Sequence, residues 1–135
     1  MKTLRFALLV AMLSGIFSSA QPGTASAAMY RDPLALVQGY FFALKTGNTL
    51  ALSSMIKGKL KESRHQVLHD RPGYARFLRD YYKAAELQDV DIEYMSPNEA
   101  KCTLHVRQGM DTVRFQLLLE YSEQDGWKIV DELLE

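Results

Sequence analysis

The sequence predicts an α+β domain in which three helices come first and a four-stranded antiparallel meander follows. Three observations support this prediction: a helical apolar period in the first half, alternation of apolar and polar residues from Glu86 onward, and turn signals between the alternating segments. Helices followed by strands is the order of α+β domains, in which the helices cover one face of the sheet.

The stretch FFALKTGNTLALSSMI joins the first two predicted helices through a tight hinge. Asp32 and Pro33 suit the N-cap and the first position of the first helix, because the carboxylate accepts backbone N–H groups and proline has none to satisfy. Gly47 supplies a left-handed stop, and Asn48 caps the second helix. The hinge therefore lets two apolar helix faces close on one core.

A third helix is predicted over residues 71–85, where tyrosine, phenylalanine and leucine form one broad stripe. The preceding stretch, residues 57–70, is basic and polar with isolated apolar residues, so we expect a partly helical, exposed connection there. Both a lid and a plain surface loop are consistent with this composition.

Four strands follow, separated by turn signals that include Pro97-Asn98 and Asp125-Gly126. They are predicted over residues 89–95, 100–107, 112–121 and 127–134. Their alternation puts apolar side chains on one face and polar or charged side chains on the other, as in an antiparallel sheet with one wet face. The mixed charges of the wet face allow two copies to pair through it, so a homodimer is an open alternative.

The N-terminus reads as a signal peptide. A positively charged start precedes the apolar run FALLVAMLSGIF, which is short for a membrane span, and the polar stretch after it ends in the A-x-A motif ASA. We therefore expect cleavage after Ala27, with Ala20 as the second-choice site. Residues 1–27 would be removed, and residues 28–135 would form one periplasmic or secreted domain with no membrane span.

The predicted mature chain is close to neutral. Removing Lys2 and Arg5 from the 16 basic residues leaves 14 against 16 acidic ones, a formal charge of −2. Nucleic-acid binding requires a concentrated basic field, so this balance argues against a nucleic-acid partner.

The cysteine and histidine residues do not indicate a metal or thiol site. Cys102, the only cysteine, alternates with apolar neighbours and is predicted to be a small buried hydrophobe. His65 and His69 would share a helix face, but a catalytic zinc site needs a third protein ligand and supporting partners. His105, the only other histidine, falls on the wet face of a strand, so we expect neither a metal nor another cofactor.

In the order and spacing of these elements, the chain resembles the NTF2-like (cystatin-like α+β barrel) superfamily, and its small exported bacterial, lumazine-binding-like members in particular. The resemblance rests on a first helix ending YFFALKTGN, a second helix directly after Gly47-Asn48, a short third helix and a meander ending EQDGWKIVDELL. The family most often has Asp at the position of Asn48, and both residues cap helices. The resemblance implies a cone, in which the curved sheet wraps the helices and leaves a pocket at its open end.

The chain carries an aromatic set that is large for its length and could line such a pocket. Most of these residues must be core, but buried tyrosines need hydroxyl partners, and a tyrosine-lined pocket suits a flat or amphipathic small molecule. The candidate ligand-pocket residues are Tyr40, Phe41, Tyr74, Phe77, Tyr81, Tyr94, Phe115, Tyr121 and Trp127.

Asp131 is the candidate catalytic residue. If Trp127 and Ile129 point inward, the period-two alternation of a strand carries Asp131 to the same face, where a partly desolvated carboxylate suits a general base. Tyr40 or Tyr94 would then serve as the hydrogen-bond donor. The alternative is a solvated or arginine-paired Asp131 at the sheet rim, because acid–base catalysis needs partners that the sequence does not supply.

Three functions follow from these observations. The first is non-enzymatic binding of a small amphipathic or aromatic ligand, or an accessory role. The second is a small hydrolase or isomerase that uses Asp131, and the third is an interaction module that works through the wet sheet face. The resemblance does not choose among them, because the family includes isomerases, dehydratases, hydrolases, transport factors and binding domains. A lone acid without a convergent base favours the first.

Overall fold

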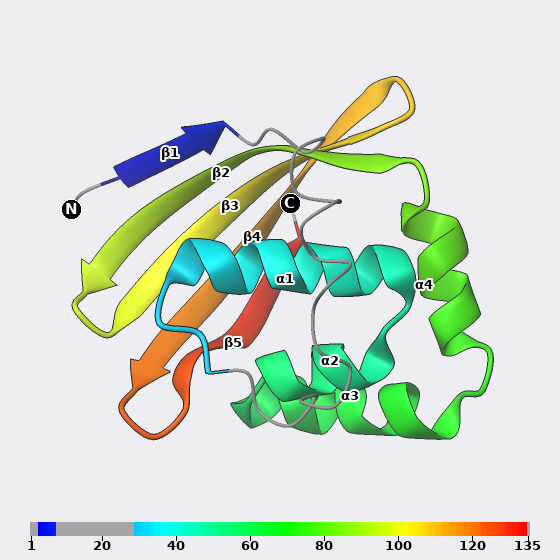
Figure 1. Cartoon of the computed structure of the whole chain (residues 1–135), viewed down its shortest axis with the longest axis horizontal. Helices are drawn as coiled ribbons and strands as arrows, with labels where there is room; N and C mark the ends of the chain where they lie inside the picture. The colour runs from blue at the N-terminus through cyan, green and yellow to red at the C-terminus, as the bar shows by residue number, and fades with distance from the viewer. Residues whose placement is uncertain (1–2, 8–28, 135) are drawn as a thin grey trace, which may run out of the picture.

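The computed structural model describes residues 3–7 and 29–134, and it confirms the α+β prediction (Figure 1). In chain order the elements are β1 (Thr3–Ala7), α1 (Pro33–Thr46), α2 (Thr49–Met55), α3 (Gly58–Asp70), α4 (Tyr74–Tyr82), β2 (Ala85–Ser96), β3 (Glu99–Gln108), β4 (Asp111–Ser122) and β5 (Gly126–Leu134). Helix α1 lies across one face of the sheet, with α2 and α3 below it and α4 at one end of the molecule.

The sheet contains the predicted meander and one further strand. Strands β2 to β5 pair antiparallel in sequence order, and the sheet stays open. Strand β1 pairs antiparallel with the free edge of β2, with Leu4 opposite Ile92 and Arg5 opposite Asp91. This strand was not expected, because its residues belong to the predicted signal peptide. Most of that predicted segment, including both expected cleavage sites, lies outside the described residues.

The hinge between α1 and α2 has the predicted geometry. A side-chain oxygen of Asp32 accepts the Leu34 N–H at 3.1 Å, and the side chain of Asn48 accepts the Ala51 N–H at 3.0 Å. Gly47 has φ +66°, and a Cβ added to it would lie 2.3 Å from the carbonyl oxygen of Ala75 in α4. The hinge therefore needs glycine for its left-handed backbone and also for its close approach to α4.

Residues 58–70 form a complete helix, α3, where a partly helical connection was expected. Among the α3 residues whose burial the structure describes, Leu60, Arg64 and Val67 are buried or partly buried, and they follow helical spacing. The charged and polar positions between them made the two apolar residues look isolated. With α3 complete, the helical layer has four helices rather than three.

The core lies between α1 and the inner face of the sheet. Leu36 and Val37 of α1 are fully buried and belong to the same cluster as Ile92, Leu117 and Ile129, each no more than 1 % exposed. Removing such side chains from water is the main stabilising contribution that a disulfide-free domain of this size has. Among the described residues, no helix is both long enough and apolar enough to cross a bilayer.

Candidate functional site

A cavity of about 320 Å³ opens where α1, α3 and α4 meet the inner face of the sheet. We call it the helix–sheet cavity. Its lining is mostly aromatic and aliphatic, and one charged pair lies within it. The lining residues are Tyr40, Phe41, Leu44, Arg64, Tyr74, Phe77, Leu78, Tyr81, Tyr82, Leu104, Phe115, Leu117 and Glu132. A volume of this size is at the lower end of the range for small-molecule sites.

Three side chains from three elements form the polar centre of the cavity. The Tyr40 hydroxyl of α1 donates a hydrogen bond to Glu132 Oε2 of β5 at 2.8 Å. Arg64 Nη2 of α3 donates to the other carboxylate oxygen, Oε1, also at 2.8 Å. The side chains of Glu132 and Arg64 are 17 % and 29 % exposed, whereas Tyr40 is 3 % exposed. The pair is therefore largely desolvated, and hydrogen bonds satisfy both oxygens of the carboxylate.

The surroundings hold the tyrosines of this cavity in their neutral form. Burial, followed by the negative charge of Glu132, raises the pKa of Tyr40 above its ordinary value. The same two causes raise the pKa of Tyr82 to about 12. Burial acts to lower the pKa of Arg64, but its ionisable neighbours, Tyr40 and Glu132 first, outweigh burial and raise it, Tyr40 contributing once its phenol ionises at high pH. At neutral pH the cavity thus presents a guanidinium, a carboxylate and neutral phenols.

The predicted inward orientation of Asp131 is wrong. Leu119 pairs with Ile129 and Leu118 with Asp131, so the ladder between β4 and β5 shifts register at residue 130. This bulge moves the alternation by one residue, and Asp131 becomes exposed while Glu132 takes the cavity-facing position. Asp131 Oδ1 accepts the backbone N–H of Glu132 at 2.9 Å. A general base facing the helix–sheet cavity therefore cannot be Asp131.

Six of the nine predicted pocket residues line the cavity, and three lie elsewhere. Tyr94, Tyr121 and Trp127 form a separate aromatic cluster, with ring centroids 6.2 Å apart for Tyr94 and Trp127 and 5.5 Å apart for Tyr121 and Trp127. Trp127 begins β5 at the β4–β5 turn, whereas Phe115 lies opposite the far end of β5, at Leu134. An inward-facing residue therefore reaches the cavity only at one end of the sheet. The prediction of a single pocket for all nine residues is wrong for these three.

Helix α4 presents a ladder of stacked rings at the cavity mouth. The ring centroids of Tyr74 and Phe77 are 6.1 Å apart with planes at 20°, and those of Phe77 and Tyr81 are 5.8 Å apart at 28°. Phe77 is 55 % exposed and Tyr81 is 53 % exposed, although both line the cavity. Large apolar rings that are half exposed and already stacked are suited to covering a flat molecule.

Sequence reasoning missed both members of the charged pair. Arg64 had a detectable signal, because it follows Leu60 and precedes Val67 at helical spacing. Glu132 had none, since strict alternation puts it on the wet face and nothing in the local sequence marks the bulge. Tyr82 belonged to the predicted aromatic stripe of residues 71–85 but was not selected for the pocket.

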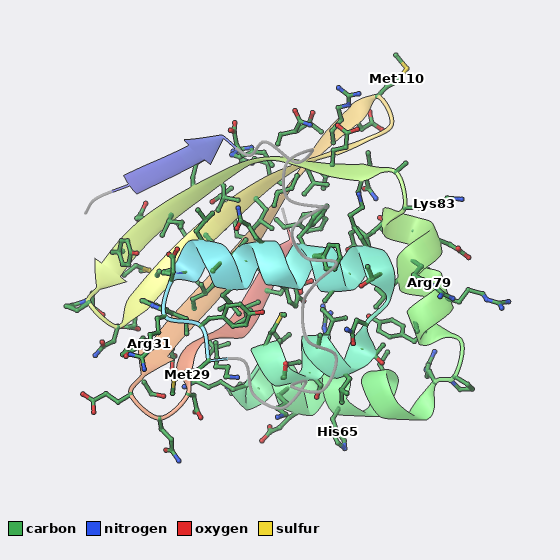
Figure 2. All side chains as sticks on the ribbon, viewed as in Figure 1. Met29, Arg31, His65, Arg79, Lys83 and Met110 are labelled. Carbon is green, nitrogen blue, oxygen red and sulfur yellow. The ribbon has the colours of Figure 1, made fainter. Side chains whose placement is uncertain are left out.

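The remaining candidate residues lie outside this cavity. Cys102 is fully buried, as predicted, and burial raises the pKa of its thiol to about 12. His105 Nε2 lies 2.9 Å from Asp91 Oδ2 on the other face of the sheet. His65 is exposed and points away from α3 (Figure 2), and the side chain of His69 is outside the described residues. Within the described part of the chain, no group of His, Cys, Asp and Glu residues could hold a metal ion.

Comparison with known proteins gives no family. No family model, no curated protein and no solved structure matches this chain. The assignment of function therefore depends on the geometry described above.

Proposed function

We propose that this chain is an exported NTF2-like domain that binds a small, flat, amphipathic ligand in the helix–sheet cavity and catalyses no reaction on it. The observation that carries the proposal is the combination of a cavity of about 320 Å³ with half-exposed stacked rings at its mouth and a partly buried guanidinium within it. Pockets with an apolar lining and a few convergent polar groups are the usual form of small-molecule sites.

The lining indicates the chemistry of the ligand. The Tyr74–Phe77–Tyr81 ladder favours a planar, apolar body that stacks on the rings. Arg64 uses Nη2 to contact Glu132, and a guanidinium has five N–H donors, so it retains donors for a ligand oxygen. A flat molecule with an anionic or carbonyl group at one end would satisfy both features.

The polar centre favours binding over catalysis. Each oxygen of Glu132 already accepts one hydrogen bond, from Tyr40 or from Arg64, so this carboxylate holds two neighbouring side chains in place and, among the described residues, has no second acid or base beside it to complete an acid–base pair. The neutral Tyr40 hydroxyl is buried and donates its proton to that carboxylate. Asp131, the other candidate acid, is exposed to solvent.

Native mass spectrometry and a fluorescent probe test the proposal. Protein purified from its own export compartment is expected to retain a small molecule that is lost on unfolding. The stripped protein should bind 8-anilinonaphthalene-1-sulfonate, a flat aromatic sulfonate, at one site. Phe77→Ala should weaken this binding about tenfold, because stacking between the probe and an aromatic ring contributes about 1.4 kcal/mol.

Phe42→Ala is the matched control. Phe42 is 62 % exposed and does not line the cavity, so its removal should leave probe affinity unchanged. Equal losses in the two variants, or binding that appears only when the protein begins to unfold, would reject the helix–sheet cavity as the site. Turnover of a candidate ligand that disappears in Glu132→Gln would reject the non-enzymatic part of the proposal.

A further inference from the structure

The near-neutral net charge conceals two strongly charged halves. Residues 45–83 contain nine Lys or Arg and three Asp or Glu residues, a formal charge of +6. Residues 84–135 contain four Lys or Arg and twelve Asp or Glu residues, a formal charge of −8. The first segment is α2, α3 and α4 with the end of α1, and the second is the β2–β5 meander. The helical layer is therefore basic and the sheet is acidic.

The positive charge reaches a defined end of the molecule. One open surface depression is bordered by Lys45 of α1, by Arg76 and Arg79 of α4 and by Lys83 directly after α4, together with a single acid, Asp80. We call these four basic residues the α4 patch. Arg79 and Lys83 project outward from α4 (Figure 2), and the acidic β2–β3 and β4–β5 turns lie at the opposite end of the molecule (Figure 1).

Exposed apolar side chains accompany the positive charge. Phe77 and Tyr81 of α4, Phe42 of α1 and Leu50 of α2 are all between 53 % and 62 % exposed. Phe42 lies three residues before Lys45 on α1, so the two share a helix face. On α4 itself, Phe77 and Tyr81 lie on a different side of the helix from the basic residues, so Phe42 is the exposed ring that shares a face with the α4 patch. A basic side chain beside an exposed aromatic ring is typical of the headgroup level of a bilayer.

We infer that the α4 end of the protein binds peripherally to the surface of an anionic phospholipid bilayer. A bilayer surface is broad and negative, so it attracts the α4 patch while the acidic sheet points away into solvent. A second copy of the chain would offer negative charge on its sheet, but Phe42 beside Lys45 would then meet a polar surface. This inference goes beyond the proposed ligand binding and does not depend on it.

Vesicle flotation with the full chain tests the inference. Wild type and the triple variant Arg76→Gln, Arg79→Gln, Lys83→Gln are compared on vesicles of phosphatidylcholine with one quarter phosphatidylglycerol and on vesicles of phosphatidylcholine alone. One basic residue at an anionic surface contributes about fivefold to partitioning, so the triple variant should bind about 100-fold more weakly to the anionic vesicles. Binding of wild type should also weaken as sodium chloride is raised.

Two controls separate the α4 patch from other causes. The variant Lys101→Gln, Arg107→Gln, Arg114→Gln removes the same net charge from the sheet and should bind like wild type. Neutral vesicles measure any binding through the apolar N-terminal run, which the α4 variant should not change. The three exchanged α4 residues are exposed, so the variant should keep the melting temperature of wild type.

Three outcomes would overturn the inference. The first is equal loss of binding in both triple variants, because that reports net charge rather than the α4 patch. The second is equal binding of wild type to anionic and neutral vesicles. The third is lipid-independent self-association in sedimentation velocity that the α4 variant abolishes, because the patch would then contact a second copy of the chain.

Discussion

Glu132→Leu should destabilise the fold by about 3 kcal/mol, although Glu132 is an acidic residue near the end of the last strand. The substitution removes the acceptor of the Tyr40 hydroxyl, which belongs to a residue only 3 % exposed, and an unpaired buried hydroxyl costs about 1–3 kcal/mol. It also removes the counter-charge of Arg64, and a hydrogen bond to a charged group contributes about 1.5–3 kcal/mol. The lower part of that range applies because the Arg64 side chain is 29 % exposed and can turn toward water.

Urea unfolding followed by tryptophan fluorescence measures this cost. Trp127 is the only tryptophan and is 5 % exposed, so its emission should shift when the chain unfolds. Glu132→Gln should cost about 1 kcal/mol, because the amide oxygen can still accept from Arg64 and the amide N–H can donate to the Tyr40 hydroxyl. Asp131→Asn, one residue away and exposed, should stay within about 0.5 kcal/mol of wild type. A Glu132→Leu midpoint equal to that of Asp131→Asn would refute the buried network.

Three further outcomes follow from the structure. Gly47→Ala should lower the free energy of unfolding in urea by about 2 kcal/mol or more, because an added Cβ would lie 2.3 Å from a carbonyl oxygen of α4. Gly58 also has a positive φ of +67° but has open space around it, so Gly58→Ala should cost about 1 kcal/mol. Equal costs in the two variants would show that the close approach is unimportant. Burial raises the pKa of Tyr40, and of Tyr82 to about 12, from an ordinary value of 10.0, so the unfolded chain loses these protons first. Stability should therefore be intact below pH 10 and fall toward pH 12, and of the seven tyrosines these two should add their share of the absorbance at 295 nm only as helicity is lost. Burial also raises the pKa of the Cys102 thiol to about 12, so a thiol reagent at pH 8 should react at least about 100-fold faster with the protein unfolded in urea than with the native protein. Fast labelling of the native protein would contradict the burial of Cys102.

The parts of the fold that could be predicted are those that local chemistry determines. Asp32, Gly47 and Asn48 make the hydrogen bonds and the left-handed turn that their residue types favour, and the three turns of the meander fall where they were expected. Helix α3 was underestimated because Arg64 stands between Leu60 and Val67 on the buried side of the helix, and an arginine in that stripe hides the period. Strand β1 was missed because its apolar run has a competing interpretation as a targeting segment.

The candidate site was only partly predictable, for a different reason. The aromatic lining follows from helical spacing and, for Phe115, from strand alternation, and most of it was anticipated. The charged pair depends on long-range geometry: α3 must bring Arg64 to the end of β5, and β5 must shift register by one residue. Charge was misleading in the same way, since a total near zero says nothing about where the charges lie.

The register shift at residue 130 has a consequence for comparing this chain with any relative. The acid that faces the helix–sheet cavity is determined by the number of residues between it and Ile129 across the bulge, and only secondarily by its residue type. Straightening the strand at its present length would turn Glu132 out and bring Asp131, one methylene shorter, toward Arg64, whereas deleting Val130 along with the bulge would leave Glu132 two residues after Ile129 and still facing inward. Column-by-column alignment would therefore misassign the functional acid in any relative whose last strand runs straight.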